Sequence, residues 1–218
     1  MDFSGALSAA NLSYMMKGLL VTLEIAAWSI VLSFIVAIII AVLRYAKIPV
    51  LSPLLMLWVE LIRNLPLLLL IFFTFFAIPE VAHIDLTEKQ AAIVALTVFD
   101  SAMISEIIRS GLNSIPKGQT EAARSSGLSY VQTLRYILVP QALRRMIPPI
   151  VSQFISLLKD TSFTIIIALE ELMRTAQVVY ARDMNYVFPV LIFVALVYFV
   201  INFSLSRVAA QLERKYSV

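Results

Sequence analysis

Residues 18–43 read GLLVTLEIAAWSIVLSFIVAIIIAVL, a run with one charged residue, Glu24. About 20 apolar residues are enough for a helix to cross roughly 30 Å of hydrocarbon. The apolar core of a secretory signal is shorter, about 7–15 residues. The run therefore predicts a retained transmembrane helix, with Glu24 at its outer interface.

The composition of the whole chain agrees with a membrane protein. The 218 residues are 61% hydrophobic and 14% charged, whereas soluble domains have about 25% charged residues. The net charge is +3, but the basic residues stand at the ends of apolar runs and form no single patch, which argues against nucleic acid as a partner. The absence of cysteine and the single histidine, His83, exclude thiolate and histidine-rich metal sites.

Five apolar segments follow one another along the chain, at about residues 17–43, 51–77, 90–108, 147–169 and 187–208. They predict an all-α integral membrane protein with five transmembrane helices, and we expect residues 1–218 to form a single transmembrane domain. Pro66 predicts a kink in the second segment. Glu60 and Arg63 are one helical turn apart and are expected to pair with each other.

The distribution of lysine and arginine predicts the orientation in the membrane. One side would hold Arg44, Lys47, Arg109, Lys117, Arg124, Arg135, Arg144, Arg145, Arg207, Arg214 and Lys215, and the other Lys17, Lys89, Arg174 and Arg182. By the positive-inside rule the first group is cytoplasmic. The N-terminus is then outside, the C-terminus inside, and the long loop from Arg109 to about Met146 cytoplasmic.

The chain lacks sequence features that several classes of enzyme and transporter need. ATP hydrolysis on this chain would need a glycine-rich phosphate loop of the G-x-x-x-x-G-K-S/T type, and none of the five glycines forms one. An intramembrane hydrolase would need a base beside its serine, and the one histidine is in a distant loop. A self-sufficient secondary carrier or channel is the remaining alternative, although such proteins usually have more spans or inverted repeats.

The loop between the third and fourth segments contains the most specific motif. Residues 121–127 read EAARSSG, and nine residues later residues 137–140 read ILVP. We predict a short helix over residues 117–127, begun after Pro116. The small residues Ala122, Ala123, Ser126 and Gly127 share one stripe of this helix. Such a smooth face favours docking against a partner, whereas a helix lying on the membrane would carry large apolar residues there.

The spacing of EAA, glycine and I-x-L-P resembles the EAA loop of bacterial ABC-importer permeases, located here at about residues 116–140, with Val139 at the leucine position. Residues 60–66 (ELIRNLP), 105–111 (SEIIRSG) and 159–162 (KDTS) resemble further segments of the permeases for polar amino acids. The whole chain is similar to the glutamine-transport permeases of Gram-positive bacteria, although Asn64 and Leu65 replace the commoner Gly-Thr.

This resemblance implies the ABC type I importer permease fold, with five spans and a cytoplasmic coupling helix, in a bacterial cell membrane. A second permease subunit would complete a homodimer or heterodimer around the translocation path. An ATPase subunit would bind ATP and magnesium, so no cofactor is expected on this chain. An extracytoplasmic binding protein would deliver a polar amino acid, with glutamine favoured. The residues expected to couple to the ATPase are Glu121, Ala122, Ala123 and Gly127.

Polar side chains also follow one face of the fourth segment. Gln153, Ser156, Asp160 and Thr164 are spaced by 3, 4 and 4 residues, which aligns them on a helix. Such residues either join neighbouring helices or line a watery cavity. If the substrate is an amino acid zwitterion, its carboxylate would accept hydrogen bonds from Lys159, Thr161 and Ser162. Its ammonium group would donate to Asp160.

Two other polar groups have open interpretations. In the third segment Asp100, which shares a face with Thr97, Ser101 and Ser105, either faces the same cavity or pairs with a basic residue. Before the last span, Glu170, Glu171, Arg174, Arg182 and Asp183 form either a docking surface for the binding protein or an ordinary solvated face.

Overall fold

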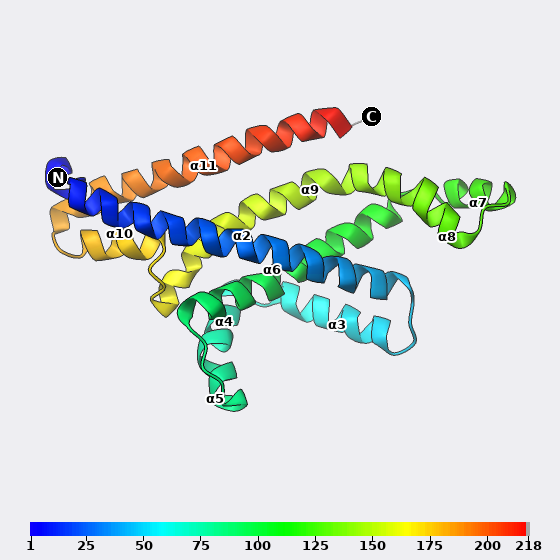
Figure 1. Cartoon of the computed structure of the whole chain (residues 1–218), viewed down its shortest axis with the longest axis horizontal. Helices are drawn as coiled ribbons and strands as arrows, with labels where there is room; N and C mark the ends of the chain where they lie inside the picture. The colour runs from blue at the N-terminus through cyan, green and yellow to red at the C-terminus, as the bar shows by residue number, and fades with distance from the viewer. Residues whose placement is uncertain (217–218) are drawn as a thin grey trace.

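The computed structural model describes the backbone of residues 1–216 and the side chains of residues 1–211, and in this part every regular element is helical (Figure 1). The α-helices are α1 (Phe3–Ala6), α2 (Ala9–Tyr45), α3 (Leu51–Asn64), α4 (Leu67–Phe72), α5 (Ile78–Ala82), α6 (Glu88–Asn113), α7 (Lys117–Ser125), α8 (Tyr130–Thr133), α9 (Val139–Asp160), α10 (Leu172–Tyr180) and α11 (Val187–Tyr216). Short π-helical turns η1 (Phe73–Ala77) and η2 (Leu134–Leu138), and 3-10 turns η3 (Thr161–Ile167) and η4 (Met184–Tyr186), connect some of them.

Four described stretches are long and apolar enough to cross a membrane: Ala9–Tyr45, Glu88–Asn113, Tyr130–Ile167 and Met184–Gln211. A fifth span is present when Leu51–Asn64 and Leu67–Ala82, which meet at an angle of 106°, are counted together. The predicted break at Pro66 is therefore confirmed, and it is a sharp bend. Leu65 is extended, with ψ of 143°, and Pro66 has no N–H to continue the helix.

The fourth predicted segment lies within a longer helical stretch. Helical structure begins at Tyr130, well before residue 147, and the long loop from Arg109 to Met146 is mostly helical. A capping box between Ser129 and Gln132 starts the helix. Arg144 and Arg145, which the charge count assigned to the cytoplasmic side, lie on the exposed face of α9.

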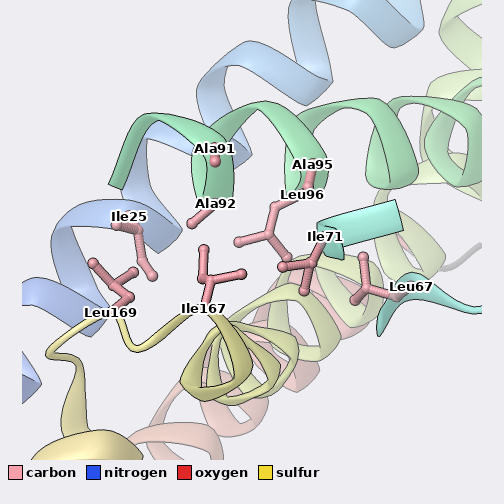
Figure 2. Close-up of a cluster of buried hydrophobic side chains, with 9 residues drawn as sticks. All are labelled: Ile25, Leu67, Ile71, Ala91, Ala92, Ala95, Leu96, Ile167 and Leu169. Atoms are coloured by element: carbon pink, nitrogen blue, oxygen red, sulfur yellow. The ribbon is translucent and has the colours of Figure 1, made fainter. Parts of the chain in front are cut away.

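The bundle core is built where α2 and α6 run side by side. Ala91, Ala92 and Ala95 of α6 are fully buried, and such small residues let helices in a membrane approach closely. Figure 2 shows these alanines and Leu96 facing side chains of α2, α4 and the segment after α9, namely Ile25, Leu67, Ile71, Ile167 and Leu169. This cluster joins segments from four parts of the chain.

The two ends of the bundle differ. At one end α7 and α8 extend beyond the other helices, and at the other end α10 lies beside α2 and the start of α11 (Figure 1). Gly18 of α2 allows this second contact, because a β-carbon there would lie 2.9 Å from the Glu171 carbonyl oxygen. The side chains of Arg214 and Lys215, which the charge count assigned to the cytoplasm, lie outside the described residues.

Candidate functional site: a projecting helix and the polar groups behind it

The predicted helix after Pro116 is confirmed as α7, and its end has a specific backbone geometry. Gly127 has φ of +86°, the left-handed region that favours glycine. The Gly127 N–H donates to the Arg124 carbonyl at 3.0 Å, and the Leu128 N–H donates to the Ala123 carbonyl at 3.2 Å. These two bonds make a Schellman motif. The chain therefore turns sharply out of α7 at Gly127.

The four predicted coupling residues do not all share one exposed surface. Glu121, Ala122 and Gly127 are exposed, whereas Ala123 is only 8% exposed. Ala123 thus packs α7 against the rest of the chain, and the other three are free to meet a partner.

A buried apolar cluster connects α7 to the bundle. Ile115, in the turn before α7, packs in a cluster with Leu138, Ala142 and Met146. Nearby, the Arg145 guanidinium donates to the Ser114 carbonyl and, at 3.1 Å, to the Ser114 hydroxyl. A force on α7 would therefore reach α6 and α9 directly.

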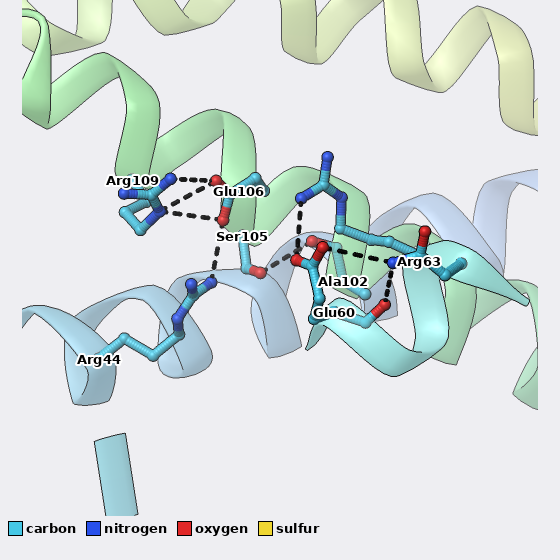
Figure 3. A network of polar contacts seen from close by, with 8 residues as sticks. Arg44, Glu60, Arg63, Ala102, Ser105, Glu106 and Arg109 are labelled. Atoms are coloured by element: carbon cyan, nitrogen blue, oxygen red, sulfur yellow. Dashed lines mark hydrogen bonds and ion pairs between the residues drawn. The ribbon is translucent and has the colours of Figure 1, made fainter. Parts of the chain in front are cut away.

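Farther from α7 along α6, the carboxylate of Glu106 is shared by two arginines (Figure 3). Arg44 of α2 donates to Glu106 Oε2 at 3.2 Å, and Arg109 Nε donates to both carboxylate oxygens at 3.0 Å. The link between Arg44 and Glu106, 62 residues apart, was not anticipated. The predicted pair of Glu60 and Arg63 is confirmed, with a nitrogen-to-oxygen distance of 3.8 Å.

Asp100 of α6 is hydrogen-bonded to an amide side chain, and no basic residue pairs with it among the described side chains. Its Oδ1 accepts from Gln153 Nε2 of α9 at 2.7 Å, and the residue is fully buried. Within the described residues Asp100 Oδ2 and Thr97 Oγ1 have no hydrogen-bond partner. The structure thus brings together two of the predicted substrate residues, at the contact between α6 and α9.

The remaining predicted substrate residues lie around the end of α9. Lys159 is exposed, and Ser156, Asp160 and Ser162 are half-buried. The α-helix stops at Asp160 and tightens into η3, so Thr164 does not continue the regular stripe. The Thr161 hydroxyl donates to the Leu158 carbonyl at 2.7 Å, which favours this tightening. The Ser162 hydroxyl likewise donates to the Lys159 carbonyl at 2.7 Å.

The charged segment before the last span contains a group that is not at the surface. Glu171 is fully buried, so it belongs to neither a docking surface nor a solvated face. Its carboxylate caps α10 by accepting from Met173 N at 2.9 Å and Arg174 N at 2.7 Å. The hydroxyls of Thr22 and Tyr198 each lie 3.4 Å from Oε2. Glu171 therefore joins α2, α10 and α11, a role that sequence pattern alone did not indicate.

Glu24 at the same end lies at the surface of the chain. Lys89 Nζ at the start of α6 donates to Glu24 Oε2 at 2.8 Å, and both side chains remain partly exposed. The pair ties α2 to α6 without a buried charge.

With the bent pair counted as one span, the described helices form a five-span bundle with a projecting helix between its third and fourth spans, the architecture of a multi-pass membrane protein. Residues 33–218 match the family described as "Binding-protein-dependent transport system inner membrane component", and the chain belongs to this family.

Its relatives share nearly the full length. The chain is 61% identical to the "Probable glutamine ABC transporter permease protein GlnP" of Bacillus subtilis over 98% of both chains. It is 41% identical to the "Probable glutamine ABC transporter permease protein GlnM" of the same organism over 94% of both. A solved structure described as an amino acid ABC transporter with histidines matches with a TM-score of 0.90 and 27% identity, over 99% of each chain.

Proposed function

We propose that this chain is the membrane-spanning subunit of an ATP-driven importer that moves glutamine into the cytoplasm. The proposal is based mainly on the structure of α7. This helix has small exposed residues and is joined to one end of the bundle by a buried apolar cluster. The 61% identity to a probable glutamine permease supports the substrate. A self-sufficient secondary carrier is not favoured, because the chain belongs to a family of binding-protein-dependent systems.

In this proposal a separate ATPase subunit binds ATP and magnesium and docks around Glu121, Ala122 and Gly127, while Ala123 holds α7 in place. Closure of two ATPase subunits would pull on α7, and the contacts of Ile115 and Arg145 would pass the motion to α6 and α9. The α7 end is then cytoplasmic, which agrees with the excess of lysine and arginine there. The N-terminus would be outside and the C-terminus inside.

The whole chain would act as one transmembrane domain and pair with a second permease, either another copy or a similar chain. Two relatives of this chain, GlnP and GlnM, occur in one organism. This supports the heterodimer as an alternative to the homodimer. An extracytoplasmic binding protein would deliver glutamine to the end that holds α10.

For substrate contact we propose the group around the end of α9. Lys159 would meet the glutamine carboxylate, and Asp160 the ammonium, with Ser156 and Ser162 beside them. Thr161 would act through the shape of η3, since its hydroxyl is engaged with the backbone. The buried pair of Asp100 and Gln153 would hold α6 against α9 along the path.

We expect Asp160→Asn to lower the rate of glutamine uptake by about tenfold, the effect of losing roughly 1.4 kcal/mol of charge-assisted contact with the ammonium. Binding of the loaded binding protein to the membrane complex should stay unchanged. Uptake of labelled glutamine into vesicles and pull-down of the binding protein measure the two effects. Uptake kinetics equal to those of the unaltered chain would remove Asp160 from the path.

The proposed substrate is tested by reconstituting the chain with its ATPase and binding protein in lipid nanodiscs. ATP hydrolysis is measured as glutamine, glutamate, arginine, histidine and cystine are added one at a time. We expect stimulation by glutamine. Stimulation by another amino acid alone would keep the importer class and overturn the substrate.

A further inference from the structure

A large groove opens at the α7 end of the bundle and is separate from the proposed substrate group. It encloses about 1160 Å³ between α2, α3, α6 and the start of α9. This exceeds the roughly 300–1,000 Å³ of ordinary small-molecule pockets. Its wall includes Ile38, Val42, Met56 and Leu143, whose side chains are each more than 40% exposed. The groove thus presents exposed apolar side chains.

The mouth of the groove carries positive charge. Arg44, Lys47 and Arg109 all line it, and Figure 3 shows that both arginines share the single carboxylate of Glu106. One positive charge of the two arginines is therefore left uncompensated. Lys47 has no ion pair among the described side chains, so the mouth has two positive charges in excess.

The position of the mouth corresponds to a membrane interface. Lys47 lies in the turn between α2 and α3, just beyond the end of a membrane-crossing helix. Tyr45 and Tyr130 also line the groove, and tyrosine is enriched at the level of lipid headgroups. Apolar walls therefore continue directly into a cationic rim at headgroup depth.

We propose that this groove binds one anionic phospholipid from the leaflet on the α7 side. Its phosphate meets Lys47 and Arg109, and its acyl chains lie along Ile38 and Val42. Basic pockets between transmembrane helices bind such headgroups by charge attraction. A zwitterionic lipid offers no net charge to the rim, and a soluble anion would leave the apolar wall uncovered. The bound lipid would also cover the junction of α2, α6 and α9 near the base of α7.

The test reconstitutes the full chain, with the partner subunits that copurify with it, in phosphatidylcholine nanodiscs. The discs contain a trace of photoactivatable phosphatidylglycerol or photoactivatable phosphatidylcholine with identical acyl chains. After illumination, the labelled peptides are identified by mass spectrometry. We expect phosphatidylglycerol to label residues 34–56 and 130–150 more strongly than phosphatidylcholine, by about fivefold for each cationic contact.

Two variants and one control separate the groove from the general surface. Lys47→Gln removes one exposed charge and should lower the phosphatidylglycerol labelling about fivefold. Ile38→Trp fills the apolar wall and should lower it as well. Arg144→Gln removes an equal charge from the exposed face of α9 outside the groove and should leave the labelling unchanged.

Equal labelling by the two lipids would overturn the proposal, as would full phosphatidylglycerol labelling in both groove variants. Cross-links from the groove peptides to a second permease or to the ATPase, in place of lipid, would assign the groove to that partner and would equally overturn it.

Discussion

Gly127→Leu is expected to abolish glutamine uptake while the protein still inserts into the membrane. A leucine side chain would project from the turn beside the exposed face of α7 and keep the ATPase surface from docking. It would also adopt φ near +86°, which costs about 1–2 kcal/mol for a residue with a β-carbon. Uptake into vesicles and the amount of protein in the membrane fraction measure the two parts of the prediction.

Gly127→Ala is the matched control, because alanine has the same left-handed strain without the bulk. The surroundings of Gly127 are open, and an added β-carbon would meet no atom of this chain within 4 Å. We therefore expect the alanine variant to retain most of its uptake. Equal loss in both variants would attribute the effect to the backbone, and normal uptake by the leucine variant would remove α7 from the coupling mechanism.

Glu171→Ala is expected to lower the stability of the chain by about 3 kcal/mol, through loss of a helix cap and of buried charge-assisted hydrogen bonds. The backbone N–H groups of Met173 and Arg174 would lose their acceptor. Tyr198 and Thr22 would lose their contact to the Glu171 carboxylate, while the Leu172 N–H would still donate to the Thr22 hydroxyl oxygen. Thermal unfolding of the purified chain in detergent, followed by tryptophan fluorescence, measures the change.

Two comparisons make this result specific. Glu171→Gln keeps an acceptor oxygen and should cost less than the alanine variant. Glu170→Ala changes an exposed neighbour whose carboxylate contacts only the Tyr14 hydroxyl, at 3.2 Å, in the described structure, and should shift stability by less than about 0.5 kcal/mol. An unchanged unfolding temperature in Glu171→Ala would show that the buried carboxylate does not hold the three helices together.

The parts of the fold that local pattern determines could be predicted from the sequence. Apolar length located the spans, Pro66 located the break in the second one, and Pro116 with Gly127 bounded α7. The one-turn spacing of Glu60 and Arg63 predicted their pair. In each case the physical cause acts within a few residues along the chain.

The parts that depend on how helices pack could not be predicted. Arg44 and Glu106 meet because α2 lies along α6, which no spacing within either helix reveals. Glu171 resembled its charged neighbours Glu170 and Arg174, and it is buried because α10 folds back onto α2. The hydrogen bond from Arg145 of α9 to the Ser114 carbonyl likewise depends on how α9 packs beside the end of α6.

Coupled uptake in sealed proteoliposomes tests whether this chain imports glutamine at the expense of ATP. The chain is reconstituted with its ATPase, ATP is enclosed, and labelled glutamine is added outside with the binding protein. We expect glutamine to accumulate inside against its gradient only when both ATP and the binding protein are present. Accumulation without ATP, driven by an ion gradient across the membrane, would contradict it and make the chain a secondary carrier.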